Sequence, residues 1–323
     1  MTLHQRLIFP FLLALLFLAG CAGQAPKLTS FAINMDRKKA GLERHEIDLP
    51  DGVRYVYLAG GKGDVLMLLH GFGGNKDNFT RVAAGLTKDY RVVIPDHVGF
   101  GESTHLPDGD YTPAAQAKRL HAFAQALNIK DVHLGGNSMG GQIAMAYAEL
   151  YRDEVKSMWL LDPSGIWDAP KSEFAEIYLK TGKNPLIVRS EDEFADVFKM
   201  VMSDPPFVPR IVLNTMAQER IKNADLEEKI FQQIVNDPSM EKRVKDLPIP
   251  TLIVWGTEDR LIHPATADIL HKLLPNSKVI MLKDTGHMPM LEQPGTTAWD
   301  YVRFRKNYVA KLKLPPAEAQ ASK

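Results

Sequence analysis

Short runs of apolar residues alternate with amphipathic stretches along much of the chain. The continuous apolar run at 65–69 predicts a strand that is buried on both faces, and the apolar-rich stretches at 91–95, 132–136 and 158–161 predict further strands. Apolar positions spaced three and four apart predict helices over 78–88, over 113–127 and after residue 138. Because strands and helices alternate, the pattern predicts an α/β fold with a mostly parallel, doubly wound sheet covered on both faces.

A hairpin precedes this region, and a different pattern interrupts it. Residues 46–58 are typical of a β-hairpin around an Asp51-Gly52 turn. From 167 to 247 the sequence is richer in charged residues and helix formers, and the strand pattern returns at 251–255 and 278–282. We therefore predict one α/β core made of residues 45–166 and 248–315. A helical cap at 167–247 would interrupt this core, and a C-terminal tail would cover 316–323.

The first 21 residues are predicted to be a signal peptide or a membrane anchor. After Arg6, the run from Leu7 to Ala19 is apolar and contains a single proline. A helix of this length spans about 20 Å, which is shorter than the ~30 Å hydrocarbon core of a bilayer. That length favours a signal peptide over a spanning helix. Residues 22–44 would then form a juxtamembrane segment.

The end of this segment suggests how the chain is anchored. The stretch Leu18-Ala19-Gly20-Cys21 resembles the lipobox of bacterial lipoproteins, in which the peptide is cut before a cysteine that receives lipid chains. The resemblance implies that Cys21 is lipidated, and several chains on one residue give stable anchoring. The alternative is an ordinary signal peptide or an uncleaved membrane anchor, in either of which Cys21 has no role. Either arrangement would place the folded body at a bacterial membrane, facing the periplasm.

Composition excludes several classes of function. The chain has 323 residues, with 39 Lys and Arg against 39 Asp and Glu, so its formal net charge is zero. Nucleic-acid binders usually carry a basic surplus, so nucleic acid is not expected as a partner. Cys21 is the only cysteine, which excludes an intramolecular disulfide and a cysteine-based metal cluster. We expect no metal and no cofactor, and the sequence leaves a homodimer open.

A candidate nucleophile lies where a predicted strand meets a predicted helix. The stretch Gly136-Asn137-Ser138-Met139-Gly140 matches the pattern G-x-S-x-G. In this context the pattern predicts a tight turn that exposes the Ser138 hydroxyl beside a helix N-terminus. A serine is a weak nucleophile at neutral pH and needs a base. The competing interpretation is a glycine-rich turn with a solvated serine.

The base and the acid are expected after later strands. His287 follows the last predicted strand, behind a glycine, and is the candidate general base. Asp259 follows the strand at 251–255 and is the candidate acid that orients the imidazole. The order Ser138, Asp259, His287 is that of α/β-hydrolase triads. Glu258 is adjacent to the acid position, and Asp162, after the strand at 157–161, is a rival acid.

An oxyanion hole is expected beside this serine. The stretch His70-Gly71-Phe72-Gly73-Gly74 follows the strand at 65–69. In this arrangement two backbone N–H groups, here those of Phe72 and Met139, would bind the oxyanion. His70 precedes the nucleophile in the chain, so we interpret it as a residue that holds the loop. Asp96 is interpreted in the same way, as a tie to the loop at 99–101.

These motifs resemble the α/β-hydrolase superfamily over residues 45–310. They are most similar to bacterial lipolytic family V lipases and esterases, to monoacylglycerol lipases of the ABHD type and to a membrane-anchored phospholipase A1 of pseudomonads. The similarity is carried by 70–79, 136–141, 205–207, 217–220 and 286–290. The resemblance implies hydrolysis of carboxylic esters of acyl lipids under a helical cap. Its triad corresponds to Ser138, Asp259 and His287.

Three functions compete at this stage. The favoured one is a membrane-anchored lipase or esterase, which includes phospholipase A and lysophospholipase activity, and which forms an acyl-Ser138 intermediate. The second is a carbon–carbon bond hydrolase of the meta-cleavage type, whose members carry a similar serine turn but are usually cytoplasmic. The third is a lipid-binding protein without catalysis, since fold alone does not fix function. Retention of all three triad residues favours an enzyme.

Overall fold

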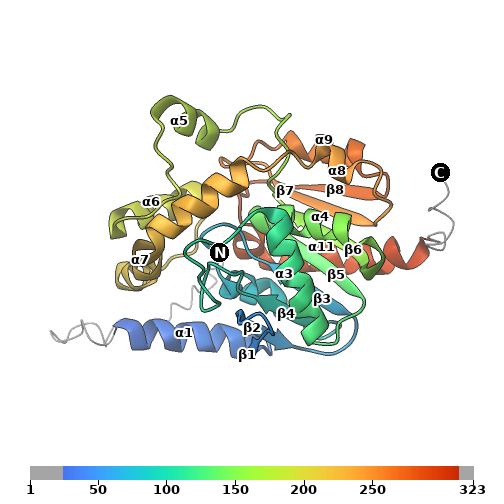
Figure 1. The fold of residues 1–323 in the computed structure, drawn as a ribbon, viewed down its shortest axis with the longest axis horizontal. Helices are drawn as coiled ribbons and strands as arrows, with labels where there is room; N and C mark the ends of the chain where they lie inside the picture. The colour runs from blue at the N-terminus through green and yellow to red at the C-terminus, as the bar shows by residue number, and fades with distance from the viewer. Residues whose placement is uncertain (1–24, 313–323) are drawn as a thin grey trace, which may run out of the picture.

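The computed structural model describes residues 25–312 (Figure 1). Its centre is an eight-stranded sheet with the order β1-β2-β4-β3-β5-β6-β7-β8. Strands β1 and β2 form an antiparallel hairpin, and β2 pairs antiparallel with β4. The remaining neighbours, in the order β4-β3-β5-β6-β7-β8, are all parallel. The strands are β1 (Glu43–Asp48), β2 (Arg54–Gly60), β3 (Val65–Leu69), β4 (Arg91–Pro95), β5 (Val132–Asn137), β6 (Val155–Leu161), β7 (Thr251–Gly256) and β8 (Ser277–Leu282). The predicted fold class is confirmed.

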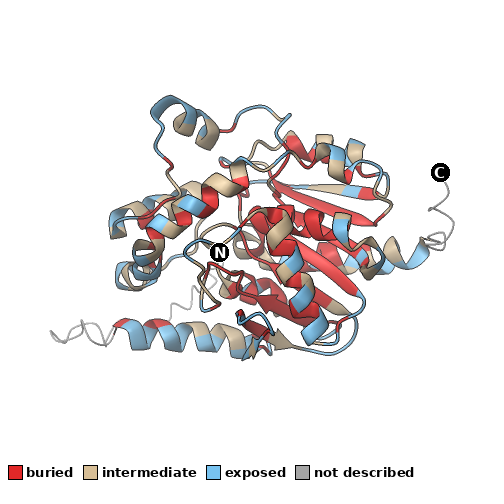
Figure 2. Ribbon diagram, in the orientation of Figure 1, coloured by how far each residue is buried: buried red, intermediate tan, exposed pale blue. Residues whose placement is uncertain are grey.

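Helices cover both faces of the sheet and create two hydrophobic cores. Successive side chains of a strand point to opposite faces, so Met67 and Leu69 of β3 join one core while Leu66 and Leu68 join the other. Figure 2 shows the strands buried between these layers. The first core is covered by α3 (Pro113–Ala126), α4 (Met139–Leu150) and α9 (Thr266–Leu273), and the second by α2 (Thr80–Ala83), α10 (Pro289–Glu292) and α11 (Pro294–Asn307).

One predicted helix is much shorter than expected. The sequence predicts a helix over 78–88, but the structure has a 3-10 turn, η2 (Lys76–Phe79), followed by the single turn of α2. The N–H groups of Gly85 and Leu86 bond to carbonyls three residues earlier, which ends the α-helical pattern. Glycine has a low helix propensity, and Gly85 also packs closely against Ala298 of α11. The glycine and its close packing against α11 therefore end the helix before residue 88.

Four helices lie between β6 and β7, within the segment predicted as a cap. They are α5 (Glu173–Thr181), α6 (Glu191–Val201), α7 (Arg210–Val235) and α8 (Glu241–Val244). We call residues 167–247 the cap segment. In Figure 1, α5, α6 and α7 gather on one side of the sheet. A small core of Val188, Phe194 and Ala217 joins α6 to α7. The proposed division of the chain into core and cap stays a prediction.

The N-terminal helix of the described region packs on the body. Helix α1 (Ala25–Lys39) lies beside α7, and Arg37 makes a two-pronged ion pair with Asp77, at 2.6 and 2.7 Å. Over residues 25–312, none of the helices combines the length and the apolar character needed to cross a bilayer. The predicted signal segment 1–21, its Cys21 and the tail 316–323 lie outside the described residues.

Buried histidines lead us to expect a loss of stability at mildly acidic pH. Burial lowers the pKa of His70 to about 4 and that of His133 to about 3, and it lowers the pKa of His97 well below its usual value. Between the ordinary value near 6.5 and these lowered values, the unfolded chain binds more protons than the folded chain. The free energy of unfolding therefore falls as the pH decreases, by about 2 kcal/mol per histidine from pH 7 to 5.

The contribution of one histidine is measured by chemical unfolding of His133→Gln at pH 7, 6 and 5. His133 lies on β5, where its Nδ1 atom is 2.8 Å from Ser157 Oγ. Its replacement should reduce the slope of the unfolding free energy against pH, because one proton-binding difference is removed. The matched control is His45→Gln, at an exposed position on β1. Equal slopes in wild type and His133→Gln would contradict the expectation.

Candidate active site

Ser138 lies in a strained turn between β5 and α4. Its φ of 55° and ψ of −122° fall in a region that non-glycine residues rarely adopt. Such a backbone costs about 1–3 kcal/mol and is typical of functional sites. The glycines beside it permit close packing, because a Cβ at Gly136 would lie 2.3 Å from the Gly140 carbonyl oxygen, and one at Gly140 would lie 2.1 Å from that of Leu69. The turn therefore requires small residues on both sides of the serine.

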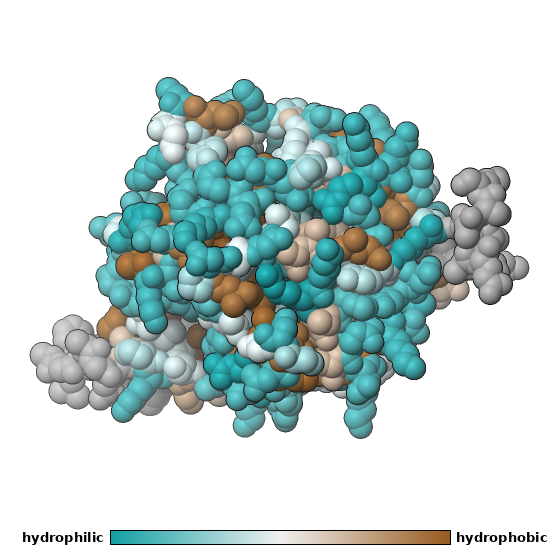
Figure 3. Space-filling view, in the orientation of Figure 1, coloured by the Kyte–Doolittle hydropathy of each residue, from teal (hydrophilic) through white to brown (hydrophobic). Residues whose placement is uncertain are grey.

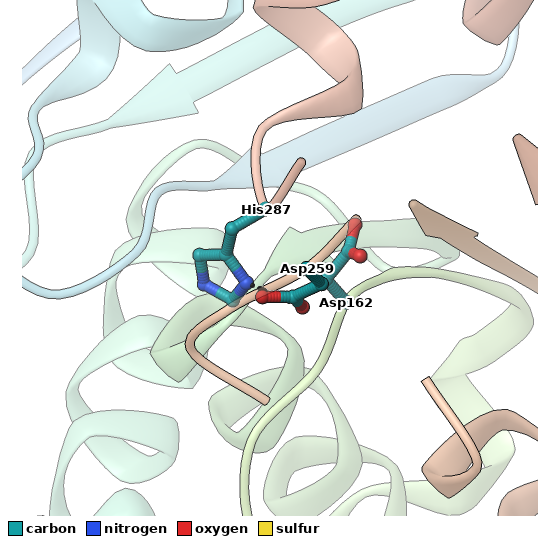
Figure 4. Close-up of side chains that lie close together, drawn as sticks. All are labelled: Asp162, Asp259 and His287. Carbon is teal, nitrogen blue, oxygen red and sulfur yellow. Dashed lines mark hydrogen bonds and ion pairs between the residues drawn. The ribbon is translucent and has the colours of Figure 1, made fainter. Parts of the chain in front are cut away.

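His287 and Asp259 form a buried hydrogen-bonded pair (Figure 4). The Nδ1 atom of His287 is 2.8 Å from Asp259 Oδ2, and the two residues are only 3% and 6% exposed. A carboxylate can only accept, so the proton of this bond is assigned to Nδ1. The other carboxylate oxygen accepts the N–H groups of Leu261 and Ile262 at 2.8 and 3.1 Å. Asp259 is thus fixed at the end of β7 and sets the orientation of the imidazole.

The rival acid, Asp162, is buried beside this pair but does not take its place. It lies at the end of β6, and its Oδ1 atom accepts the N–H of Gly256 at 2.9 Å. Its Oδ2 atom is buried without a hydrogen-bond partner among residues 25–312. Burial, together with the nearby charge of Asp259, raises the pKa of Asp162 well above its ordinary value. These surroundings favour the protonated form of Asp162, whereas Asp259 is the carboxylate that bonds the imidazole.

Asn137, the residue before Ser138, links the serine turn to the backbone of His287. The Nδ2 group of Asn137 donates to the carbonyl oxygen of His287 at 2.9 Å and to that of Leu161 at 3.1 Å. The Nε2 atom of His287 is buried and has no hydrogen-bond partner in the described part of the chain, so it makes no bond to Ser138. Catalytic hydrogen bonds of free enzymes are often long and tighten once substrate is bound. Nε2 is thus available as a proton acceptor.

The predicted oxyanion loop lies directly against the serine turn. A Cβ built on Gly71 would be 3.2 Å from the Cβ of Ser138, so this loop and the nucleophile are in contact. Phe72 is the next residue of the loop. Met139 begins α4, and the first N–H groups of a helix have no partner within it. Met139 is therefore next to Ser138 in the chain, and Phe72 follows the loop residue that contacts Ser138.

Buried hydrogen bonds of His70 and Asp96 hold this loop in place. The Nδ1 atom of His70 lies 2.8 Å from the Gly71 carbonyl oxygen, and its Nε2 accepts the N–H of His97 at 3.0 Å. The carboxylate of Asp96 accepts the N–H of Lys76 at 2.7 Å and its ammonium at 2.8 Å. It also accepts the N–H of Glu102 at 2.8 Å. These contacts match the loop-holding roles that the sequence predicts for His70 and Asp96.

Within residues 25–312, one group of three side chains has a spacing that suits a metal ion, and it includes the His287–Asp259 pair. Ligand atoms of Asp162, Asp259 and His287 all lie within 4.8 Å of one another. The Nδ1 atom of His287 is already engaged with Asp259, and a protonated Nδ1 has no lone pair for a metal. The geometry therefore favours an acid–histidine pair over metal binding.

The order and placement of these elements identify the family. Residues 64–294 match the family model described as the alpha/beta hydrolase fold. The chain belongs to the α/β-hydrolase family. The resemblance predicted from the sequence motifs is thereby confirmed.

Three relatives of this hydrolase are similar over most of its length. It is 43% identical over 316 residues to Lipase 1 of Psychrobacter immobilis, covering 94% of this chain and 98% of the relative. It is 33% identical over 256 residues to Monoacylglycerol lipase ABHD6 of Rattus norvegicus, covering 76% of each. A crystal structure described as a membrane phospholipase A and bacterial virulence factor matches with a TM-score of 0.86 and 34% identity, covering 94% of this chain and 99% of that one.

The cap segment of the hydrolase contacts the loop that carries His287. The N–H of His287 donates to the carbonyl oxygen of Val201, at the end of α6, at 2.9 Å. Glu292 accepts the N–H groups of Gly286 and Met288 from one side and that of Ser203 from the cap segment. Because the histidine loop is bonded to both parts, its position depends on the cap segment.

Sequence reasoning did not find two residues that support this site. Asn137 occupies the variable position of G-x-S-x-G, where the motif alone does not reveal its bond to His287. Glu292 lies five residues after the histidine, and no local pattern marks it. The signal that could have found both residues is three-dimensional, since each one bonds backbone groups that are distant in the sequence or belong to the cap segment.

Proposed function

We propose that this chain is a serine hydrolase of carboxylic esters, with Ser138, His287 and Asp259 as its triad. The observation that carries the proposal is the buried His287–Asp259 pair, in which the Nε2 atom of His287 is free. This pair and the strained Ser138 turn both follow the carboxyl ends of parallel strands, at the same edge of the sheet. The backbone N–H groups of Phe72 and Met139 are assigned to the oxyanion hole. No cofactor takes part in this chemistry.

The geometry supports a two-step transfer of the acyl group to water. Ser138 Oγ attacks the ester carbonyl carbon while its proton moves to His287 Nε2. The ester C–O bond then breaks, and the leaving alcohol takes the proton from Nε2. Water attacks the acyl-Ser138 ester with the same base, which releases the fatty acid and restores the serine. Asp259 stabilises the imidazolium throughout, and the oxyanion donors stabilise both tetrahedral intermediates.

Acyl lipids are the proposed substrate class. An aromatic cluster adjoins the proposed oxyanion donor: Phe72 packs edge-on against Phe231 of α7, and Phe174 and Tyr178 of α5 pack against Phe231. Such a cluster suits an apolar acyl chain better than a polar acyl group. The three relatives, a lipase, a monoacylglycerol lipase and a membrane phospholipase A, support the same class.

Fatty-acid release from three substrates tests this proposal. We would compare a medium-chain monoacylglycerol, a lysophospholipid and a diacyl phospholipid in vesicles, with Ser138→Ala as the blank. Serine-dependent release from the phospholipids would define a phospholipase, and release from the neutral ester alone would define an esterase of neutral lipids. A protein that hydrolyses an activated ester but none of the three lipids would contradict the substrate class and favour the carbon–carbon hydrolase.

We further propose that the hydrolase is anchored to a bacterial membrane through lipidated Cys21, with its folded body in the periplasm. Helix α1 begins four residues after this cysteine and exposes Leu28, Phe31 and Met35 on one face, at 52%, 65% and 52%. The face of the molecule in Figure 3 is mostly hydrophilic, with small, separate apolar patches. An exposed apolar strip followed by basic residues is typical of a helix at a lipid surface.

The anchor leads to a prediction about Cys21. In cells that process lipoproteins, Cys21→Ser should move the hydrolase from the membrane fraction to the soluble periplasmic fraction, or leave an uncleaved precursor. Intact-mass measurement of the wild-type chain should show cleavage before residue 21 and the added lipid. The matched control is Ser30→Ala, an exposed position on α1. A wild-type chain that keeps residues 1–20 would contradict lipidation and favour the uncleaved anchor.

A further inference from the structure

A buried cation of the cap segment lies directly on the oxyanion loop. Arg220 belongs to α7 and is only 9% exposed. Its guanidinium carbon is 5.9 Å from the centre of the Phe72 ring. A Cβ built on Gly73 would lie 2.2 Å from the same carbon, so the guanidinium group rests against the Gly73 backbone. This residue belongs to the 217–220 motif noted in the sequence, to which the proposed mechanism assigns no role.

Two hydrogen bonds fix the guanidinium plane. Its Nε group donates to Glu227 Oε1 at 2.7 Å, and a terminal nitrogen donates to the Leu186 carbonyl oxygen at 2.7 Å. Glu227 lies two turns along the same helix and is 2% exposed. Its second carboxylate oxygen is buried without a hydrogen-bond partner within residues 25–312. Such a pair stabilises a fold weakly, because burying both charges offsets their attraction. Its location therefore suggests another role.

The loop beneath Arg220 leaves no room for a side chain at residue 73. Gly73 has a φ of +65°, which favours glycine, and the guanidinium group occupies the space that a side chain would need. On the other side, the Phe72 ring packs edge-on against Phe100 of the core and Phe231 of α7. The backbone on both sides of the Phe72–Gly73 peptide is thus enclosed between the core and the cap segment.

We propose that Arg220 is a positioning residue that holds the Phe72–Gly73 backbone in the orientation needed to stabilise the oxyanion. This inference rests on the ester hydrolase function proposed above. Arg220 acts through the loop: the guanidinium group fixes Gly73, and the adjacent Phe72 N–H is thereby aimed at the tetrahedral intermediate. A displaced donor loses much of its value, because a misplacement of about 1 Å can reduce a rate about 100-fold. Through this contact the cap segment contributes to catalysis.

The test compares Arg220→Met with wild type in the full-length, detergent-purified protein. On a water-soluble short-chain ester, kcat should fall about 10- to 100-fold while KM changes less than about 3-fold, since the donor acts mainly in the transition state. The Ki of an alkylboronic acid, which forms a tetrahedral adduct with the serine, should rise by a factor similar to the loss in kcat. Arg220→Lys, which keeps the charge but loses the planar group, should not restore kcat.

Two further variants separate positioning from folding. Arg220→Met leaves Glu227 buried and unpaired, so the double variant Arg220→Met/Glu227→Leu removes both charges together and should show the same loss of kcat in a stable protein. Arg243→Met is the matched control, because Arg243 makes ion pairs with Glu149 and Asp237 away from the loop. It should change thermal stability while leaving kcat unchanged.

The outcomes distinguish this inference from the proposed function. A folded double variant with wild-type kcat and boronic-acid Ki would overturn the role of Arg220, and so would rescue by Arg220→Lys. A Ser138→Ala protein that still hydrolyses the ester would instead overturn the proposed function. An inactive Ser138→Ala together with an unchanged Arg220→Met would contradict the inference alone.

Discussion

Ser138→Ala is expected to lower kcat for an activated ester by about 10⁴-fold or more. The substitution removes the nucleophile and leaves the oxyanion donors and the binding surface in place, so only their residual contribution remains. The turn itself should tolerate the change, because alanine is small and no hydrogen bond of the fold depends on the hydroxyl group of Ser138 among the bonds found within residues 25–312. Alanine keeps the Cβ atom and hence the same backbone strain, so thermal stability should change little.

Kinetics and covalent labelling check this expectation. A serine-directed fluorophosphonate should add its mass to the peptide that contains residue 138 in the wild type and not in the variant. Ser164→Ala is the matched control, because its hydroxyl group donates to Gln142 near the same turn. That control should keep wild-type activity and labelling. Activity in Ser138→Ala above about 1% of wild type, or labelling at another serine, would move the nucleophile elsewhere.

The sequence predicts most of the sheet because its signals are local. The apolar runs within β3 and β7 are continuous, and β4 and β5 are rich in apolar residues, as expected of strands that are buried on both faces. The helix predicted over 78–88 is the exception, since the packing of Gly85 against Ala298, more than 200 residues away, decides where that helix ends. Periodicity within one segment cannot report a contact of this kind.

In the candidate site, too, the residues marked by local motifs could be predicted from the sequence, and those that act through distant contacts could not. Ser138, Asp259 and His287 stand out because each follows a predicted strand in a recognisable order, and the structure brings the latter two into hydrogen-bond contact. Their triad roles stay a prediction until the variants are measured. The positioning contacts could not be predicted. Arg220 of α7 reaches Gly73 across nearly 150 residues, and only a three-dimensional structure shows what its guanidinium group touches.

The two acids near His287 should respond very differently to the same substitution. Asp259→Asn is expected to lower kcat about 10⁴-fold near neutral pH. An amide at this position can donate to Nδ1, which would place the imidazole proton on Nε2 and leave no acceptor for the serine proton. Asp162→Asn is expected to lower kcat less than about 5-fold, because burial and the charge of Asp259 already favour its protonated form, which an amide resembles in shape and lack of charge.

Comparing the two variants under one assay decides which carboxylate is the triad acid. Both are buried, both lie at strand ends, and both substitutions keep side-chain volume, so loss of packing cannot explain a difference between them. Glu258→Gln is the control for removing a negative charge nearby, since Glu258 is exposed and adjacent to Asp259. It should behave like the wild type. A nearly active Asp259→Asn with an inactive Asp162→Asn would assign the acid to β6, because the carboxylate that stabilises the imidazolium would then be the one at the end of that strand.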